Sequence, residues 1–317
     1  MGITDRIDAI TSIPPEYRKE ILPAPRSVKI ELTGRCNFAC SFCARSDMLR
    51  EQGDMDRGFF ERVSREMRDA GVEELGLFYL GESFLCKWLP DAIRHAKEIG
   101  FPYVFLTTNG SLAAPQRVKD CMEAGLDSLK FSFNYSDESQ FSEIARVKPG
   151  LFLKMVQNVK AAYSVRELVA AQTGHRCGLY ASYIQYDGDQ GEKMSAAVDE
   201  IRGYVDEVYA LPLYNQADLV TDAEKARGWK PTAGNRGRSD ALRDPLPCWA
   251  AFTEGHITFD GILSACCFDH DGRFHMGDLK TAGFMEAWNS RAFQELRRAH
   301  LKRDVAGTVC EGCVAYA

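Results

Sequence analysis

Three cysteines lie close together in the segment Cys36-Asn-Phe-Ala-Cys40-Ser-Phe-Cys43. Three thiolates can bind three irons of a 4Fe–4S cluster, which leaves the fourth iron without a protein ligand. Such an iron can coordinate a small molecule, just as a catalytic zinc keeps one position free. A structural zinc site is the alternative, but it uses four ligands and usually paired Cys-x-x-Cys units. The triplet therefore predicts an iron–sulfur cluster with one open coordination position.

A second group of cysteines lies near the C-terminus and comprises Cys248, Cys266, Cys310 and Cys313. Four thiols at these separations form either a Cys₄ zinc site or a fully ligated iron–sulfur cluster, and spacing alone does not distinguish the two. Cys267 directly follows Cys266, so one member of this pair is spare.

The composition is that of an ordinary globular protein, with 317 residues of which 45% are hydrophobic and 26% are charged. The net charge of −6 argues against nucleic-acid binding, which needs a surplus of lysine and arginine to neutralise phosphates. No segment has the apolar run of a signal peptide or a membrane span, so we expect a cytoplasmic protein. Because thiols stay reduced in the cytoplasm, the 11 cysteines indicate metal binding rather than disulfides.

Hydrophobic periodicity predicts alternating strands and helices between residues 27 and 214. Runs typical of strands cover residues 27–32, 75–80, 103–107, 128–133, 178–186 and 206–213. Helical patterns fall between them, at residues 55–70, 88–99, 113–124, 151–170 and 190–204. This alternation predicts an α/β fold with a parallel sheet, either open or a partial barrel. Its ligand site is expected at the carboxyl ends of the strands, where the cysteine triplet follows the first strand.

The chain divides into four predicted parts. These are an N-terminal arm (1–26), the sheet with its helices (27–214), a linker (215–247) and a small cysteine-rich module (248–317). The linker is charged, rich in glycine, aspartate and arginine, and without clear periodicity. In the module, Asp260–Gly261 between two apolar runs predicts a hairpin, and a helix is expected over residues 283–300.

The triplet, with Phe42 just before its third cysteine, resembles the signature of the radical S-adenosylmethionine (SAM) superfamily. The resemblance extends from residue 28 to about residue 215 and implies a partial (β/α)6 barrel. In that family the open iron binds the amino and carboxylate groups of SAM. An electron from the cluster then cleaves SAM to methionine and a 5′-deoxyadenosyl radical, which abstracts a hydrogen atom from the substrate. A reductant such as flavodoxin or ferredoxin is implied as a partner.

Further positions resemble the family's SAM-binding motifs. The sequence Leu80-Gly81-Glu82 matches a Gly-Gly-Glu motif after the second strand, with leucine in place of the first glycine. The match implies that Glu82 accepts hydrogen bonds from the SAM ammonium group. The SAM-binding residues implied by the resemblance are Phe42, Gly81, Glu82, Asn109 in a Thr-Asn-Gly turn, Ser132 and Asn134 at the ribose, and Arg146 at the carboxylate.

The second cysteine group resembles the C-terminal module called SPASM, or its shorter form, Twitch. The match comprises Cys248-x₁₂-Gly261-x₄-Cys266, a helix containing Trp288, and Cys310-x₂-Cys313. It implies an auxiliary 4Fe–4S cluster on these four cysteines, with Cys266 selected by the Gly-x₄-Cys spacing and Cys267 left as a small buried side chain. Because only four residues follow Cys313, we expect one auxiliary cluster, as in the Twitch form.

A fully ligated cluster has no open iron, so its expected role is electron transfer. Loss of a hydrogen atom, a proton and that transferred electron from an alcohol amounts to a two-electron oxidation. The chain also resembles 2-deoxy-scyllo-inosamine dehydrogenase, a Twitch enzyme of this superfamily, in the run from Gly81 to Lys87. The resemblance implies oxidation of a small polar alcohol such as a cyclitol or a sugar. Cys86 is then a candidate hydrogen donor or substrate contact. Tyr183 and Tyr186, at the end of the fifth strand, are candidates for contact with the substrate.

Two other functions remain open from the sequence. Many SPASM enzymes modify ribosomal peptides by forming a thioether or a cross-link, and these often carry a leader-binding domain, for which the 26 residues before Ser27 are too few. The other function is that of a non-catalytic binding protein stapled by zinc. The substrate itself depends on the loops at the strand ends, whose shape the sequence does not define.

Overall fold

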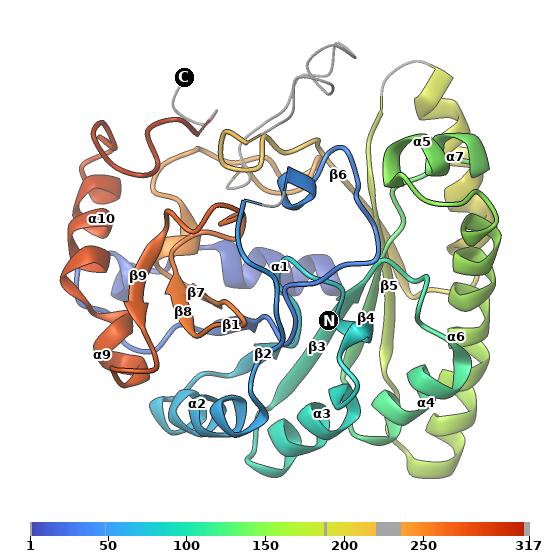
Figure 1. Cartoon of the computed structure of the whole chain (residues 1–317), viewed down its shortest axis with the longest axis horizontal. Coiled ribbons are helices and arrows are strands. Elements are labelled where there is room, and N and C mark those ends of the chain that lie inside the picture. Colours follow the sequence, from blue (N-terminus) through green and yellow to red (C-terminus); the bar gives the residue numbers. More distant parts are fainter. Residues whose placement is uncertain (1, 48, 187–188, 220–235, 314–317) are drawn as a thin grey trace.

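The computed structural model of the chain describes residues 2–47, 49–186, 189–219 and 236–313 (Figure 1). Its centre is a nine-stranded sheet, in which the described strands follow the order β6-β5-β4-β3-β2-β1-β7-β8-β9. The strands are β1 (Ser27–Ile30), β2 (Glu74–Gly76), β3 (Tyr103–Thr108), β4 (Ser128–Ser132), β5 (Gly178–Ile184), β6 (Glu207–Leu211), β7 (Glu254–Ile257), β8 (Ile262–Ser264) and β9 (His275–Asp278).

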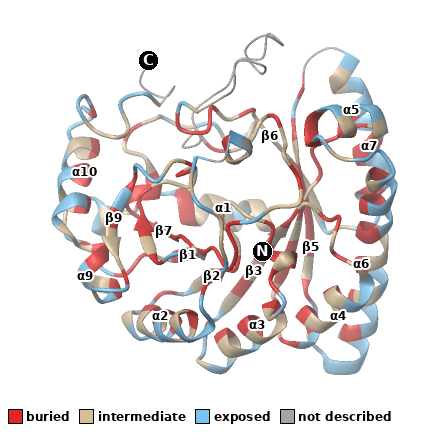
Figure 2. Cartoon of the chain, in the orientation of Figure 1, coloured by how far each residue is buried: buried red, intermediate tan, exposed pale blue. Residues whose placement is uncertain are grey.

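Strands β1 to β6 form the parallel part of the sheet that the sequence predicts. The helices of this part are α2 (Arg57–Ala70), α3 (Leu89–Glu98), α4 (Pro115–Glu123), α5 (Glu138–Ala145), α6 (Leu151–Thr173) and α7 (Asp189–Arg202). Helices α2, α3, α4, α6 and α7 lie along the outside of the sheet, with their buried residues directed towards it (Figure 2). Helix α5 lies near the carboxyl ends of the strands, where its last residues bond to the loop after β1. Because β6 and β9 are both edges, the described sheet is not closed. The predicted α/β fold with a partial barrel is therefore confirmed.

Local sequence explains where the first of these helices begins and ends. The Asp56 carboxylate accepts a hydrogen bond from the backbone N–H of Phe59 at 2.8 Å, which satisfies a free donor of the first turn of α2. Gly71 ends the helix with φ of 102°, a left-handed conformation that glycine adopts without a Cβ clash. Helix α2 therefore begins two residues after the start of the helix predicted over 55–70 and ends at the predicted residue.

Strand alternation divides the parallel sheet into a helix-covered face and an inner face. Leu75, Val104 and Leu129 are fully buried beneath the helices. The residues next to them in the strands turn inwards, and the inner face carries polar side chains that include Lys29 and Lys130. The inside of the partial barrel is therefore partly charged, whereas its outside is apolar.

The predicted N-terminal arm contains a helix, α1 (Ile3–Thr11), which the sequence analysis did not predict. It is attached to the first residues of the strands: the backbone N–H of Ile3 donates to Glu207 at 2.9 Å, and Arg6 forms an ion pair with Glu74. The Arg6 guanidinium also lies 3.3 Å from the centre of the Tyr103 ring. Helix α1 thus covers the amino ends of the strands and lies behind the middle of the molecule in Figure 1.

The cysteine-rich module continues the same sheet. Strand β7 pairs in parallel with β1, with Lys29 opposite His256, and β7 and β8 form the predicted antiparallel hairpin. Strand β9 was not predicted. The expected single helix over 283–300 is two helices, α9 (Phe284–Trp288) and α10 (Arg291–Leu301). The break lies at Ser290, whose hydroxyl caps the second helix by accepting from Phe293 N at 3.3 Å.

Two predictions in the parallel part were inexact. The strand predicted over 75–80 ends at Gly76. Of the residues that follow only Leu77 is buried, and its carbonyl accepts a hydrogen bond from Ser83 Oγ at 2.7 Å, so the chain leaves the sheet there. Helix α5 was not predicted, although its Asp137 cap accepts a hydrogen bond from Gln140 N at 2.8 Å. The predicted linker lies partly outside the described residues, which omit 220–235. None of the described helices has the length and hydropathy needed to span a membrane.

Candidate functional site

The first cysteine triplet occupies the loop after β1, at the carboxyl end of the strand. Two backbone hydrogen bonds tie this loop to the end of α5, from Ala39 N to Ala145 O at 3.1 Å and from Ser41 N to Ile144 O at 2.8 Å. A third closes a tight turn within the loop, from Cys43 N to Cys40 O at 3.0 Å. The loop therefore has a fixed path, although its cysteines are far from α5 in the sequence.

The three thiols of this loop lie near one another and are partly buried. Burial, together with the nearby Glu82 and Cys43, raises the pKa of Cys36 to about 11. Burial and the Cys43 thiol also raise the pKa of Cys40, whose sulfur is hydrogen-bonded to the Tyr135 hydroxyl at 2.8 Å. Such thiols become thiolates most readily when a cation displaces the proton. Three adjacent thiols of this kind fit an iron–sulfur cluster.

Glu82 is a buried carboxylate beside the triplet. It accepts hydrogen bonds from Thr108 Oγ1 at 2.7 Å, Asn109 N at 2.8 Å and Phe84 N at 3.1 Å. Burial raises its pKa against the effect of these donors, and no cation within the described residues forms an ion pair with it. A carboxylate in this state fits an ammonium ligand, because a buried charge is stable only when it is paired.

One glycine, Gly81, and one asparagine, Asn109, bring Glu82 close to the cysteines. A Cβ atom on Gly81 would lie 2.0 Å from the backbone oxygen of Thr33, so only glycine allows the loop after β2 to approach the loop after β1 this closely. The side-chain amide of Asn109 donates to Asn37 Oδ1 at 3.0 Å and lies 3.9 Å from Cys36 Sγ. The carboxyl ends of β1, β2 and β3 thus meet at one site.

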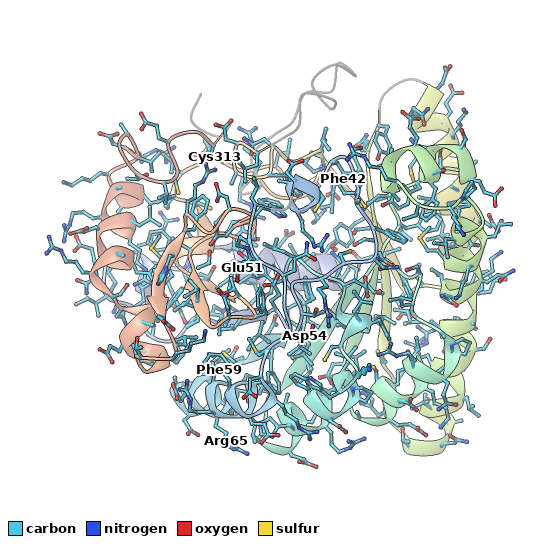
Figure 3. The ribbon with its side chains drawn as sticks, viewed as in Figure 1. Phe42, Glu51, Asp54, Phe59, Arg65 and Cys313 are labelled. Carbon is cyan, nitrogen blue, oxygen red and sulfur yellow. The ribbon has the colours of Figure 1, made fainter. Side chains whose placement is uncertain are left out.

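The remaining predicted SAM-binding residues differ in their burial and in their contacts. Ser132 ends β4 on the inner face opposite Ser182, and the buried Asn134 Oδ1 has no hydrogen-bond partner among the described atoms. The Phe42 ring centre lies 6.4 Å from that of Tyr135, and Figure 3 shows Phe42 in the upper half of the molecule. Arg146 ends α5 with φ of 54°, and its side chain is exposed. The orphaned Asn134 oxygen fits a hydroxyl ligand such as a ribose.

The second cysteine group lines one small cavity of about 40 Å³. The cavity is bordered by all five cysteines of the module: Cys248, Cys266, Cys267, Cys310 and Cys313. Burial and the nearby thiols of Cys310, Cys267 and Cys313 raise the pKa of Cys248. Hydrogen bonding with Cys267 and burial likewise raise the pKa of Cys266. Both members of the adjacent pair therefore border the cavity. Among the described residues, no three histidine, cysteine, aspartate or glutamate side chains are arranged so that they could hold a single metal ion.

A larger cavity of about 210 Å³ occupies the inside of the partial barrel. Ile3, Ile7 and Ile10 of α1 line it at the amino ends of the strands, together with aromatic residues of the sheet. Lys130 and the ion pair between Lys29 and Glu254 supply charge. Lys130 was not predicted as a site residue, although a lysine in the middle of the predicted strand 128–133 was a usable signal.

The two cavities share a wall. Trp249, which directly follows Cys248, lines both of them. On the same side of the barrel Glu254 accepts hydrogen bonds from Lys29 at 2.6 Å and from His256 at 2.7 Å. Trp249 therefore connects the wall of the barrel cavity to the wall of the cavity that the second cysteine group lines.

The three residues predicted to act on the substrate lie in different surroundings. The Cys86 thiol is buried in the core, and burial raises its pKa to about 11. Tyr183 pairs with Ala210 and alternates with Ser182, so it faces away from the inner side of the sheet. Tyr186 is buried, and its hydroxyl donates to the backbone oxygen of Asn134 at 3.1 Å. Of the three, Tyr186 is in contact with a predicted SAM-binding residue.

Comparisons with known proteins match both cysteine groups to family models. Residues 30–169 match the radical SAM superfamily, and residues 248–314 match the iron–sulfur cluster-binding domain named SPASM. Among characterised proteins, the chain is 25% identical to a PqqA peptide cyclase of Xanthomonas euvesicatoria pv. vesicatoria (strain 85-10), over 92% of this chain and 81% of that protein.

Two solved structures share the fold at low sequence identity. BtrN, in complex with AdoMet and 2-DOIA, has a TM-score of 0.56 and 16% identity, covering 87% of each chain. SuiB of Streptococcus suis, bound to the precursor peptide SuiA, has a TM-score of 0.63 and 16% identity, covering 93% of this chain and 71% of SuiB. At this level of identity the likeness extends to the fold alone.

Proposed function

The chain is a radical SAM enzyme with a C-terminal SPASM iron–sulfur module, and from this premise we propose that it oxidises a small polar substrate by two electrons. A 4Fe–4S cluster with bound SAM supplies the radical chemistry that removes a hydrogen atom from the substrate. The observation that carries the proposal is the barrel cavity of about 210 Å³, which is closed by α1 and shares Trp249 with the second cysteine group. This volume is below the roughly 300–1,000 Å³ that is usual for ligand pockets, so the cavity suits only a small molecule.

The residues of the first site would each bind one part of the cofactors. We assign Cys36, Cys40 and Cys43 to the cluster. Glu82 would accept hydrogen bonds from the SAM ammonium, since its charge has no ion-pair partner within the described residues. Ser132 and Asn134 would contact the ribose, and the exposed Arg146 would pair with the carboxylate. Phe42, Gly81 and Asn109 would shape the strand ends around the cofactor.

The second site would hold an auxiliary cluster for electron transfer. We assign Cys248, Cys310 and Cys313 to it, with the fourth ligand from the adjacent pair. The Gly-x₄-Cys spacing favours Cys266, whose sulfur also accepts a hydrogen bond from Phe268 N at 3.3 Å, whereas the proximity to Cys248 favours Cys267. Either choice leaves the cluster next to Trp249 and therefore next to the substrate cavity.

The test begins with anaerobic reconstitution, followed by iron, sulfide and zinc analysis. We expect about eight irons and eight sulfides per chain, as two 4Fe–4S clusters require. Formation of 5′-deoxyadenosine is then measured with polyols, sugars and peptides, and the product of an active substrate is analysed for the loss of two hydrogens. Zinc without sulfide would refute the enzymatic proposal and support a zinc-stapled binding protein.

A second candidate is peptide modification, such as formation of a thioether or a cross-link. The similarity to a PqqA peptide cyclase over 92% of this chain favours it. In that case the cavity would hold one side chain of the peptide rather than a whole small molecule. If only peptides stimulate formation of 5′-deoxyadenosine, the small-substrate proposal is wrong and this second candidate replaces it.

A further inference from the structure

The charged groups around the barrel cavity are paired, with one exception. Arg6 pairs with Glu74, Lys29 with Glu254 at 2.6 Å, and Arg238 with both Asp8 at 2.8 Å and Asp240. Lys130 also lines the cavity, yet no carboxylate of the described residues forms an ion pair with it. The cavity therefore contains one cation that the described part of the chain leaves uncompensated.

Lys130 is placed in the cavity by the strand itself. It lies in the middle of β4, with Thr107 of β3 and Tyr180 of β5 as its register partners. Its ammonium nitrogen is 5.8 Å from the centre of the Tyr209 ring. Two residues further along the same face is Ser132, at the carboxyl end of the strand. The ammonium group thus lies below the predicted SAM site, on the side towards α1.

The surroundings of Lys130 disfavour its charge. Burial, together with the positive charge of Lys29, lowers the pKa of Lys130 to about 8. The other titratable groups on the cavity wall are Arg6 of α1, Glu74 of β2, Tyr103 of β3, Tyr209 of β6, Tyr214, Arg238 and Glu254 of β7. Their charged members are already paired. An ammonium group that is half-buried without a counter-ion carries part of the cost of burying a charge, and an anionic ligand offsets that cost.

We propose that the barrel cavity binds an anionic oxygen group of the substrate, a carboxylate or a phosphate, and that Lys130 is the residue that holds it. This inference rests on the proposed function, since it names the chemical class of the molecule oxidised in the same cavity. The hydroxyls of Thr107, Ser128 and Tyr209 also line the cavity and can donate to the same oxygens. The anionic end would lie towards α1, which directs the rest of the substrate towards the strand ends.

The proposal is tested by binding of simple anions to the reconstituted protein with SAM. Calorimetric titrations at constant ionic strength use inorganic phosphate, succinate and the uncharged analogue succinamide. We expect phosphate, succinate or both to bind more tightly than succinamide, and the difference between the two anions identifies the substrate group. Lys130→Gln should weaken anion binding by about tenfold or more, because it removes a charge-assisted hydrogen bond. Lys130→Arg should retain most of the affinity, and the exposed Lys154→Gln should behave like the wild type.

A chemical measurement on the unmutated protein guards against effects of the substitutions on folding. Acetylation of lysines by acetic anhydride is followed by mass spectrometry with and without the anion. We expect protection of Lys130 by phosphate or succinate, no protection by succinamide, and no change at Lys154. Anions that bind no better than succinamide, or equal anion binding by Lys130→Gln, would overturn the proposal. Since neither measurement depends on turnover, failure here is distinct from a failure to form 5′-deoxyadenosine.

Discussion

Replacing Glu82 by glutamine tests the first site most directly. Glu82 Oε1 accepts from Thr108 Oγ1 and Phe84 N, while Oε2 accepts from Asn109 N. A glutamine side chain has one oxygen acceptor and one NH₂ donor. Its oxygen would take the position with two donors, so the NH₂ group would face Asn109 N–H and leave that donor without an acceptor. The substitution therefore removes a negative charge and one internal hydrogen bond together.

These two losses affect different measurements. A buried N–H without an acceptor costs about 1–3 kcal/mol of folding stability. Burial raises the pKa of Glu82, which means that the folded protein already disfavours its charge, and the neutral glutamine recovers part of this cost. We therefore expect a stability loss at the lower end of that range. Loss of a hydrogen bond to a charged group costs about 1.5–3 kcal/mol, which weakens SAM binding by about 10- to 150-fold.

Anaerobic equilibrium dialysis with labelled SAM measures the affinity, and thermal unfolding measures the stability. Glu98→Gln is the matched control, because Glu98 is exposed on α3 and the same chemical change there should alter neither property. If Glu82→Gln remains folded and binds SAM within about threefold of the wild type, the ammonium contact does not exist and the reasoning fails. An equal loss in Glu98→Gln would show that the assay reports general charge rather than the site.

The remaining predictions concern the loop, the barrel interior and the second cysteine group. Gly81→Ala should abolish SAM binding and lower the unfolding midpoint, because its Cβ would lie 2.0 Å from a backbone oxygen; unchanged dialysis and unfolding curves would contradict this. Burial by itself raises the pKa of Glu254, but Lys29 and His256 lower it to about 2. The ionised carboxylate therefore stabilises the fold at every pH above the usual glutamate pKa, and this stabilisation is lost as the pH falls towards 2. Lys29→Met should therefore cost about 3 kcal/mol at neutral pH in urea unfolding and shift the loss to higher pH. Of Cys266→Ser and Cys267→Ser, the variant that removes a cluster ligand should contain about four irons instead of about eight, whereas the other should retain both clusters. About eight irons in both variants would show that neither thiol is required.

The fold class followed from the sequence because its signals are local. Alternating apolar strands and amphipathic helices predicted the parallel sheet, and the helical pattern over 55–70 predicted α2 to within two residues. The errors arose where distant segments decide the outcome. Strand β2 stops at Gly76 within an apolar run, and β7 joins β1 from more than two hundred residues away along the chain. Neither pairing partner is visible in the periodicity of a single segment.

The candidate site shows the same difference between features that local sequence predicts and features that distant segments decide. The triplet of Cys36, Cys40 and Cys43 lies on one loop, so spacing alone was sufficient to predict a shared cluster. The second group depends on residues up to 65 positions apart, and the structure brings Cys267 to the same cavity as Cys266. Spacing could not reveal this, since adjacent residues in a loop can both turn towards one cavity.

The sequence by itself determined the iron–sulfur chemistry, the β/α architecture and the end of the sheet where the first cysteines lie. Those properties depend on residue type, short spacing and local periodicity. Only the tertiary structure decided that Glu82 is buried without an ion-pair partner in the described chain, that Trp249 lines both the barrel cavity and the cavity of the second cysteine group, and that Lys130 lines the barrel cavity. These properties depend on which distant groups surround a side chain, because burial and pairing of charge arise from packing between strands that are remote in the sequence.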